Sequence, residues 1–245
     1  MTVAEIIEKL ESLADPENVA GMRRFGITAE KAFGVAMPAL KEIVREVKKS
    51  AEDRHRLALA LWASEIHEAR IVAYLVDDPA RVTAEQMDAW ALDFDNWAIC
   101  DGACGHLFRR TPLAYEKAFA WSRRDEEFVR RAGIVRMAWL AVHDKRAPDE
   151  RIAAFLPVLE SLADDERNFV KKAVNWSLRQ IGKRNFALNR LAVETAERIR
   201  ARNTRSARWI AADAQRELES EKTRERLQKK KLRAGRKPIS PPENL

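Results

Sequence analysis

Glycine and proline, the residues that most often interrupt helices, are scarce in this sequence: 8 and 9 of 245 residues. Alanine, leucine, glutamate and arginine are abundant instead, and all four have high helix propensity. No segment shows the alternation of apolar and polar residues that is typical of a half-buried strand. The sequence therefore predicts an all-α fold.

Cysteine and histidine are also scarce, with 2 and 4 residues. Cys100 and Cys104 are four residues apart in one expected helix, which does not suggest a disulfide framework or a four-ligand zinc site, although His106 is close in sequence. We expect two buried thiols, a reducing environment and no metal. No histidine is paired with a candidate nucleophile and no glycine-rich phosphate loop is present, which weighs against acyl transfer and nucleotide-dependent chemistry.

Long apolar runs are absent as well. No window approaches the roughly 20 apolar residues of a membrane-spanning helix. The N-terminus carries acidic residues where a secretion signal needs a basic segment and an apolar run. We therefore expect a cytoplasmic protein that does not contact a membrane.

Positive charge is concentrated at one end of the chain. The formal net charge is +7, yet residues 222–237 alone carry nine Lys or Arg and one Glu, which leaves −1 for all other residues. We expect residues 1–220 to form the folded domain. Residues 221–245 are expected to be a basic, disordered C-terminal tail that begins as a fraying helix. This tail either adds non-specific affinity for DNA or serves as a solubilising extension.

Apolar residues recur with helical spacing along the folded part of the chain. The expected helices are 2–14, 17–24, 38–49, 53–64, 66–76, 83–92, 96–108, 112–123, 126–142, 148–162, 166–182, 186–201 and 204–219. Pro38, Pro112 and Pro148 lie where a proline in the first turn of a helix is tolerated.

One pattern occurs twice, 41 residues apart: Phe128-Val-Arg-Arg-Ala132 and Phe169-Val-Lys-Lys-Ala173, with a looser echo at Thr204. A period near 40 residues with two helices in each repeat is typical of HEAT-like solenoids of stacked antiparallel helix pairs. The repeat predicts that Arg131 and Lys172 occupy equivalent positions along a concave, cationic face. The alternative is that each basic doublet is merely the solvated start of a helix.

The expected helix over residues 166–182 shows two distinct faces. One face is apolar and should meet the core, whereas the other places a tryptophan among three cations, which suits a phosphate backbone and a base or sugar. The apolar face comprises Val170, Val174, Leu178 and Ile181, and the second face comprises Lys172, Trp176, Arg179 and Lys183.

Trp97 and Asp101 lie one helical turn apart in the expected helix 96–108. A carboxylate repels phosphate, but it stabilises the positive charge that develops on a sugar when a glycosidic bond breaks. Gly102 and Gly105 each cost a helix about 1 kcal/mol, which suggests that another backbone, such as that of a nucleic acid, comes close. The alternative is a tryptophan in the core and an aspartate favoured by the helix dipole.

Four motifs follow one another in a fixed order: Met22-Arg-Arg-Phe25, Trp97-x-x-x-Asp101, Phe128-Val-Arg-Arg131-Ala, and Lys172-Ala-Val-Asn-Trp176-Ser-Leu-Arg179. Together they resemble the HEAT-like DNA glycosylases of the AlkD family of alkylation-repair proteins, over roughly residues 15–200. The resemblance implies a monofunctional enzyme of base-excision repair that removes N3- and N7-alkylated purines from double-stranded DNA. It also implies a monomer at the nucleoid that needs neither a metal nor an organic cofactor.

The same resemblance assigns roles to single residues. Asp101 is similar to the catalytic carboxylate, and Trp97 and Trp176 to an aromatic pair against the lesion nucleotide. Arg131 is similar to an active-site and phosphate-binding cation. The expected DNA contacts are Phe25, Arg130, Lys172, Arg179 and Lys183.

Two residues depart from the family pattern. Phe25 stands where the family has a tyrosine, and Ala98 stands where an acidic residue is frequent. These departures leave two alternatives open, a HEAT-repeat protein that binds branched or damaged DNA without catalysis and a protein-interaction scaffold. A cationic alkylpurine is a good leaving group, so one carboxylate and an aromatic wall suffice for its excision, and the preserved Asp101 favours the enzyme.

Overall fold

A computed structural model describes residues 1–235, and every regular element in that range is a helix. The chain divides into two compact units, Met1–Leu140 and Ala141–Leu245. The all-α prediction is confirmed. The helices of the first unit are α1 (Val3–Ser12), α2 (Pro16–Arg24), α3 (Met37–Ser50), α4 (Arg54–Ala63), α5 (His67–Val76), α6 (Ala84–Leu92), α7 (Trp97–His106), the 3-10 helix η1 (Phe108–Arg110), α8 (Ala114–Ser122) and α9 (Glu127–His143), whose last turn crosses the boundary.

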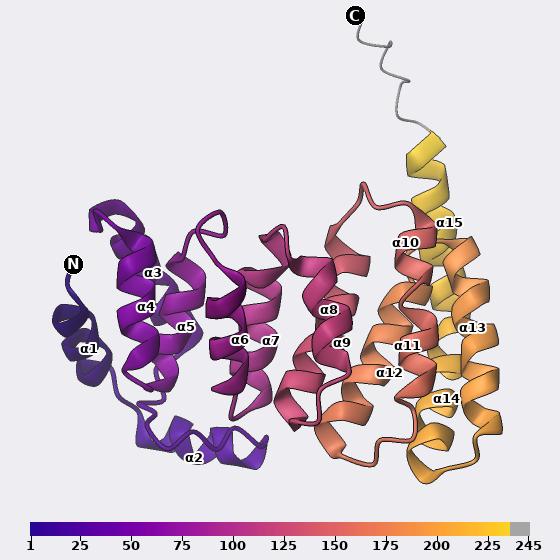
Figure 1. Ribbon diagram of the computed structural model, residues 1–245, viewed down its shortest axis with the longest axis horizontal. Coiled ribbons are helices and arrows are strands. Elements are labelled where there is room, and N and C mark those ends of the chain that lie inside the picture. Colours follow the sequence, from indigo (N-terminus) through magenta and orange to yellow (C-terminus); the bar gives the residue numbers. More distant parts are fainter. Residues whose placement is uncertain (236–245) are drawn as a thin grey trace, which may run out of the picture. The chain divides into compact units, whose positions relative to one another are not determined.

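In the second unit the long helices α12, α13 and α14 pack against one another (Figure 1). No helix within residues 1–235 combines the length and the apolar character needed to cross a bilayer. The helices of this unit are α10 (Asp149–Ala153), α11 (Leu156–Ser161), α12 (Asn168–Gly182), α13 (Phe186–Ala201), α14 (Arg205–Leu218) and α15 (Glu221–Gly235).

Most helices begin and end within a few residues of their expected bounds, and prolines account for two of the differences. The segment 148–162, expected to be one helix, is split into α10 and α11. Pro157 has no N–H to donate to the carbonyl of Ala153, so the helix is interrupted there. Likewise Pro112 precedes α8 instead of lying in its first turn.

Asn96 fixes the start of α7 and thereby the position of Trp97 and Asp101. Its side-chain oxygen accepts hydrogen bonds from the backbone N–H groups of Ala98 (3.0 Å) and Ile99 (3.1 Å). This arrangement caps the helix and satisfies two of its unpaired donors. Because Asn96 is fully buried, the cap is also part of the packing of the first unit.

The two thiols of α7 are buried against α9, as expected. Cys100 Sγ lies 3.5 Å from the carbonyl oxygen of Phe128, and Cys104 Sγ lies 3.6 Å from that of Ala132. These contacts hold α7 and α9 together along one side. Within residues 1–235, no group of three His, Cys, Asp or Glu side chains is placed to hold a metal ion.

The two glycines of α7 face aromatic rings of the protein, which corrects the expectation that a nucleic-acid backbone approaches them. A Cβ atom on Gly102 would lie 2.3 Å from the hydroxyl oxygen of Tyr74. One on Gly105 would lie 2.4 Å from Cε2 of Trp139. Glycine therefore occupies these two helical positions, despite its conformational cost, because Tyr74 and Trp139 fill the space of a side chain.

Replacing Gly105 with alanine is expected to lower the free energy of unfolding by about 1–3 kcal/mol, because the new methyl group overlaps the indole of Trp139. Gly21 in α2 is the matched control, since a Cβ there meets nothing within 4 Å. Gly21→Ala should raise stability by roughly 0.5–1 kcal/mol through helix propensity. Urea unfolding measures both changes, and a Gly105→Ala variant as stable as the parent would refute the packing argument.

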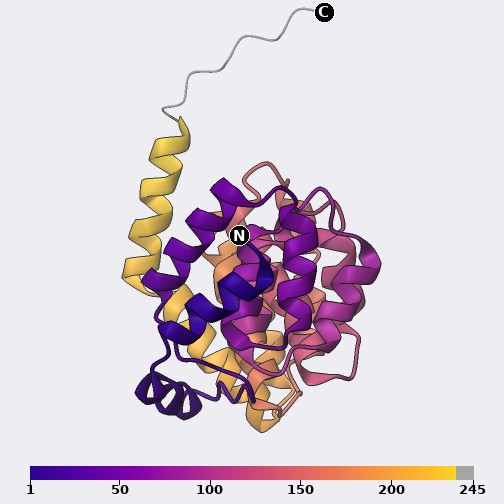
Figure 2. The ribbon, with the colours of Figure 1, turned by 90° about the vertical axis from the view of Figure 1, so that its left-hand side faces the viewer.

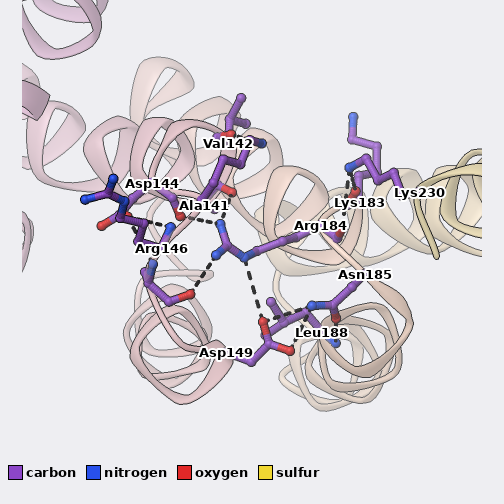
Figure 3. A network of polar contacts seen from close by, with 12 residues as sticks. Ala141, Val142, Asp144, Arg146, Asp149, Lys183, Arg184, Asn185, Leu188 and Lys230 are labelled. Carbon is purple, nitrogen blue, oxygen red and sulfur yellow. Dashed lines mark hydrogen bonds and ion pairs between the residues drawn. The ribbon is translucent and has the colours of Figure 1, made fainter. Parts of the chain in front are cut away.

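The apolar face predicted for α12 is confirmed, since Val170, Val174, Leu178 and Ile181 are fully buried. Beyond the end of α12, the guanidinium of Arg184 donates to the carbonyl oxygens of Ala141 (2.9 Å), Asp144 (2.7 Å) and Ala147 (2.7 Å). Figure 3 shows this side chain directed into the loop before α10, with Asp149 Oδ1 3.7 Å from its Nε. The bonds fasten the end of α12 to that loop.

The basic segment at the C-terminal end is helical over residues 221–235, the range in which the tail was expected to begin as a helix. Figure 2 shows α15 as one continuous helix. Thr223 and Leu227, one turn apart, are 4% and 2% exposed, so they fasten the helix to its unit. Two buried residues among many cations are too few for a compositional rule to detect. Residues 236–245 lie outside the described residues, and the boundary expected at residue 220 stays a prediction.

Candidate active site

Asp101 on α7 and Arg131 on α9 form a bidentate ion pair. Arg131 Nε donates to Asp101 Oδ1 at 2.9 Å, and Arg131 Nη2 donates to Oδ2 at 2.7 Å. The Arg131 side chain is 9% exposed and that of Asp101 is 20% exposed. Two parallel charge-assisted bonds fix the plane of the carboxylate while part of it still faces solvent.

Two opposing effects act on the acidity of Asp101. Burial raises the pKa of this carboxyl, and the charge and hydrogen bonds of Arg131 work against the rise. Burial, together with the charge of Asp101, also raises the pKa of Tyr74 far above its ordinary value, so the phenol stays protonated. The Arg131 guanidinium is therefore the main group that favours the ionised form of Asp101 against the effect of burial.

Trp97 lies one turn before Asp101, at the first position of α7, and is partly exposed. Its indole Nε1 donates to the backbone carbonyl of Phe25 at 2.9 Å, which ties α7 to the end of α2. The Phe25 side chain is 73% exposed. The first unit thus brings together the Asp101 carboxylate, its guanidinium partner and an anchored indole. The residue that accepts the hydrogen bond of the indole, Phe25, also carries an exposed phenyl ring.

The two arginines of the α9 doublet are both held by protein groups. Arg131 is bound to Asp101, so its predicted contact with phosphate stays a prediction. Arg130 donates through Nε to the carbonyl of Arg124 (2.6 Å) and through Nη2 to Asp125 (2.9 Å). Its side chain is 17% exposed. The two arginines therefore stabilise the first unit through these contacts, in addition to contributing positive charge.

The second unit holds the other predicted residues, and here the cationic face of α12 is partly neutralised. Arg179 Nη1 lies 2.5 Å from Glu217 Oε2, and Lys183 Nζ lies 2.6 Å from Glu217 Oε1. Asp213 of α14 is a further partner of Arg179 at 3.6 Å. Although burial raises the pKa of Glu217, the bonds and charges of Lys183 and Arg179 hold it below the ordinary value.

Two of the three cations on the second face of α12, Arg179 and Lys183, are thus paired with carboxylates of α14. Trp176 is half-buried, and Lys172 is exposed with no described carboxylate within ion-pair distance. Lys172 is thus the cation of this face that a phosphate can reach without displacing an acidic partner. The predicted pairing of Trp97 with Trp176 joins residues of different units and stays a prediction.

Comparison with known proteins identifies the family of this chain. The model of a family described as DNA alkylation repair enzyme matches residues 6–218. The chain belongs to this family. A solved structure described as "a new family of proteins related to the HEAT-like repeat DNA glycosylases with affinity for branched DNA structures" has a TM-score of 0.75 to this chain and 22% sequence identity. The similarity covers 93% of this chain and 96% of that one. No curated protein matches.

These comparisons confirm two of the predictions, membership of the DNA alkylation repair enzyme family and the HEAT-like repeat fold. Sequence reasoning missed three residues of the two clusters: Tyr74, Asp213 and Glu217. Asp213 and Glu217 lie four residues apart on the expected helix 204–219, which follows the looser echo of the repeat at Thr204. This spacing places both carboxylates on one face. No sequence signal identifies Tyr74, because its position depends on the packing of α5 against α7.

Proposed function

We propose that this member of the DNA alkylation repair enzyme family is a monofunctional DNA glycosylase for N3- and N7-alkylated purines. The observation that carries the proposal is the Asp101 carboxylate, held in one orientation by Arg131, partly exposed, and one turn from the anchored indole of Trp97. A structural ion pair does not require this neighbouring indole. A group that stabilises a sugar cation does, because the substrate has to be excluded from bulk water on one side.

The reaction follows from the charge of the substrate. Alkylation at N3 or N7 makes the purine cationic, so its bond to the sugar breaks without a strong general acid. The electrons of that bond leave with the base, and the sugar is left with oxocarbenium character. Asp101 stabilises this cation, Trp97 offers an apolar wall to the nucleotide, and a water molecule then attacks C1′ and loses a proton to solvent.

A second candidate is binding of branched DNA without catalysis. It is favoured by the description of the similar solved structure, which names affinity for branched DNA. The bidentate pairing of Asp101 also suits a carboxylate whose task is to hold α7 against α9. The two candidates differ in one product, the free base.

A panel of duplexes tests the proposal. N7-methylguanine is cationic, whereas O6-methylguanine carries the same alkyl group on a neutral base and serves as the matched control. We expect alkali-labile abasic sites to form at N7-methylguanine alone. Binding of a four-way junction with no abasic sites in any duplex would favour the second candidate and refute the first.

Lys172 provides a prediction about the proposed contact with DNA. Lys172→Gln should weaken duplex binding and reduce the slope of log affinity against log salt by about 0.9, the value for one lost phosphate contact. Arg179→Gln removes a charge from the same helix, but one already paired with Glu217 and Asp213, and should change the slope less. Equal slopes for Lys172→Gln and the parent protein would exclude Lys172 from the interface.

A further inference from the structure

A basic pocket lies beside α15 in the second unit, and its lining includes one of the predicted DNA contacts, Lys183. Its volume is about 780 Å³. Two carboxylates, Glu217 and Glu225, lie among its lining residues. The cations that line it are Lys183, Lys222, Arg226, Lys229, Lys230 and Arg233.

The acidic residues of the pocket are already engaged. Glu217 binds Lys183 at 2.6 Å and Arg179 at 2.5 Å, and Glu225 lies 4.0 Å from Lys229. Among the described residues, no carboxylate is within ion-pair distance of Lys222, Arg226 or Lys230. The pocket therefore keeps an excess of positive charge without a partner in the protein.

Lys230 is held in a defined position at this pocket. Its Nζ donates to the backbone carbonyl of Lys183 at 2.5 Å and lies 3.4 Å from that of Arg184, just beyond the end of α12 (Figure 3). Carbonyls at the C-terminus of a helix favour a cation. An ammonium group has three donors, so at least one remains for a ligand.

The charges of four further cations act on this amine. Burial, followed by the charges of Arg226, Lys145, Arg184 and Lys183, lowers the pKa of Lys230 to about 8. Burial and the charges of Arg184 and Arg226 lower the pKa of Lys145 as well. Glu217, the carboxylate that lines the pocket nearby, is held by Lys183. An anion in the pocket would relieve this repulsion and favour the charged form of Lys230.

The spacing of the cations indicates the kind of anion. Lys222, Arg226, Lys229 and Arg233 recur at i, i+4, i+7 and i+11, and therefore share one face of α15. At about 1.5 Å per residue this face is roughly 16 Å long. Phosphates of one DNA strand follow one another at about 3.4 Å along the duplex axis, so several of them fit along such a face.

We propose that the pocket along α15 binds phosphate groups of the DNA backbone, as a contact separate from the Asp101 and Trp97 surface. The inference deepens the proposed function, from which it takes DNA as the ligand. It replaces a general electrostatic role of the basic segment with a defined site in which position on the helix matters.

Two double variants of the full chain test whether position matters. Lys222→Gln with Arg226→Gln removes two cations that line the pocket. Arg224→Gln with Lys231→Gln removes two exposed cations of the same helix that do not line it. Binding of an unmodified duplex is measured from low to moderate salt, and circular dichroism verifies the fold of each variant.

The pocket variant is expected to reduce the salt slope by nearly two units, at about 0.9 per lost phosphate contact, and the control variant by much less. Equal losses in both variants would mean that any cation of α15 serves, which overturns a defined site, and no loss in either overturns contact with DNA. Since the duplex is unmodified, this binding does not depend on excision. A protein that binds through the pocket but releases no base from the N7-methylguanine duplex would refute the glycosylase and leave the site intact.

A titration of Lys230 by NMR identifies the source of the phosphate. Duplex DNA is expected to raise the pKa of Lys230 above about 8, so that DNA affinity falls as the pH rises through the pKa of the bound state. Lys230→Gln should remove that part of the decrease. A rise caused by inorganic phosphate but not by DNA would assign the pocket to free phosphate and overturn the DNA contact.

Discussion

Replacing Asp101 with asparagine is expected to slow base release by about 100-fold or more, the scale for removing an electrostatic group from a transition state. The amide keeps the shape of the carboxylate but cannot offset the charge of the sugar cation. Duplex affinity should persist or increase, because a negative charge near phosphate is removed. Single-turnover excision from N7-methylguanine duplex at saturating enzyme measures the effect.

A matched variant separates catalysis from stability in this experiment. Asp101→Asn leaves the Arg131 guanidinium without its counter-ion, which lowers the free energy of unfolding. Asp101→Asn combined with Arg131→Met removes both charges, so it should recover much of that stability without recovering excision. Excision at the parent rate in either variant would refute the catalytic assignment of Asp101.

Replacing Arg131 with methionine is expected to move the pH dependence of excision to higher pH. Arg131 lowers the pKa of Asp101 against the effect of burial, so without it burial is opposed only by the hydrogen bond with Cys100 and the pKa rises further. The ionised carboxylate is the active form. Activity should therefore be lost at low pH and recover as the pH increases through the raised pKa.

The shift in the profile distinguishes positioning of Asp101 from general stabilisation by Arg131. Arg131→Lys is the conservative variant: it keeps a charge but not the bidentate geometry, so its profile should lie between those of Arg131→Met and the parent. Thermal unfolding of each variant defines the range in which rates are compared. An unchanged profile for a folded Arg131→Met variant would mean that Arg131 does not set the ionisation of Asp101.

The helices and the spacing of Trp97 and Asp101 could be predicted from the sequence, because both depend on local rules. Apolar periodicity located α12 and its buried face, and the i, i+4 relation of Trp97 and Asp101 requires only that the segment be helical. Asp53, Thr83 and Asn96 cap α4, α6 and α7, and each of these helices begins near its expected residue. Where a local rule was misapplied, as at Pro157, a single helix was expected in place of two.

The partners of the site residues could not be predicted from the sequence, because they come from distant parts of the chain. Arg131 meets Asp101 across 30 residues, and Glu217 meets Lys183 across 34. Each pairing requires the packing of two helices, which periodicity in one helix does not specify. The packing of α15 against its unit could not be predicted for a related reason, since the burial of Thr223 and Leu227 depends on the surface that they contact.

The most direct test of the proposed function is the identity of the released product. An N7-methylguanine duplex is incubated with the protein, and the reaction is analysed by mass spectrometry before any treatment with alkali. A monofunctional glycosylase predicts free N7-methylguanine together with an intact strand that carries one abasic site. A protein that binds this duplex yet releases no base above the spontaneous rate would contradict the account.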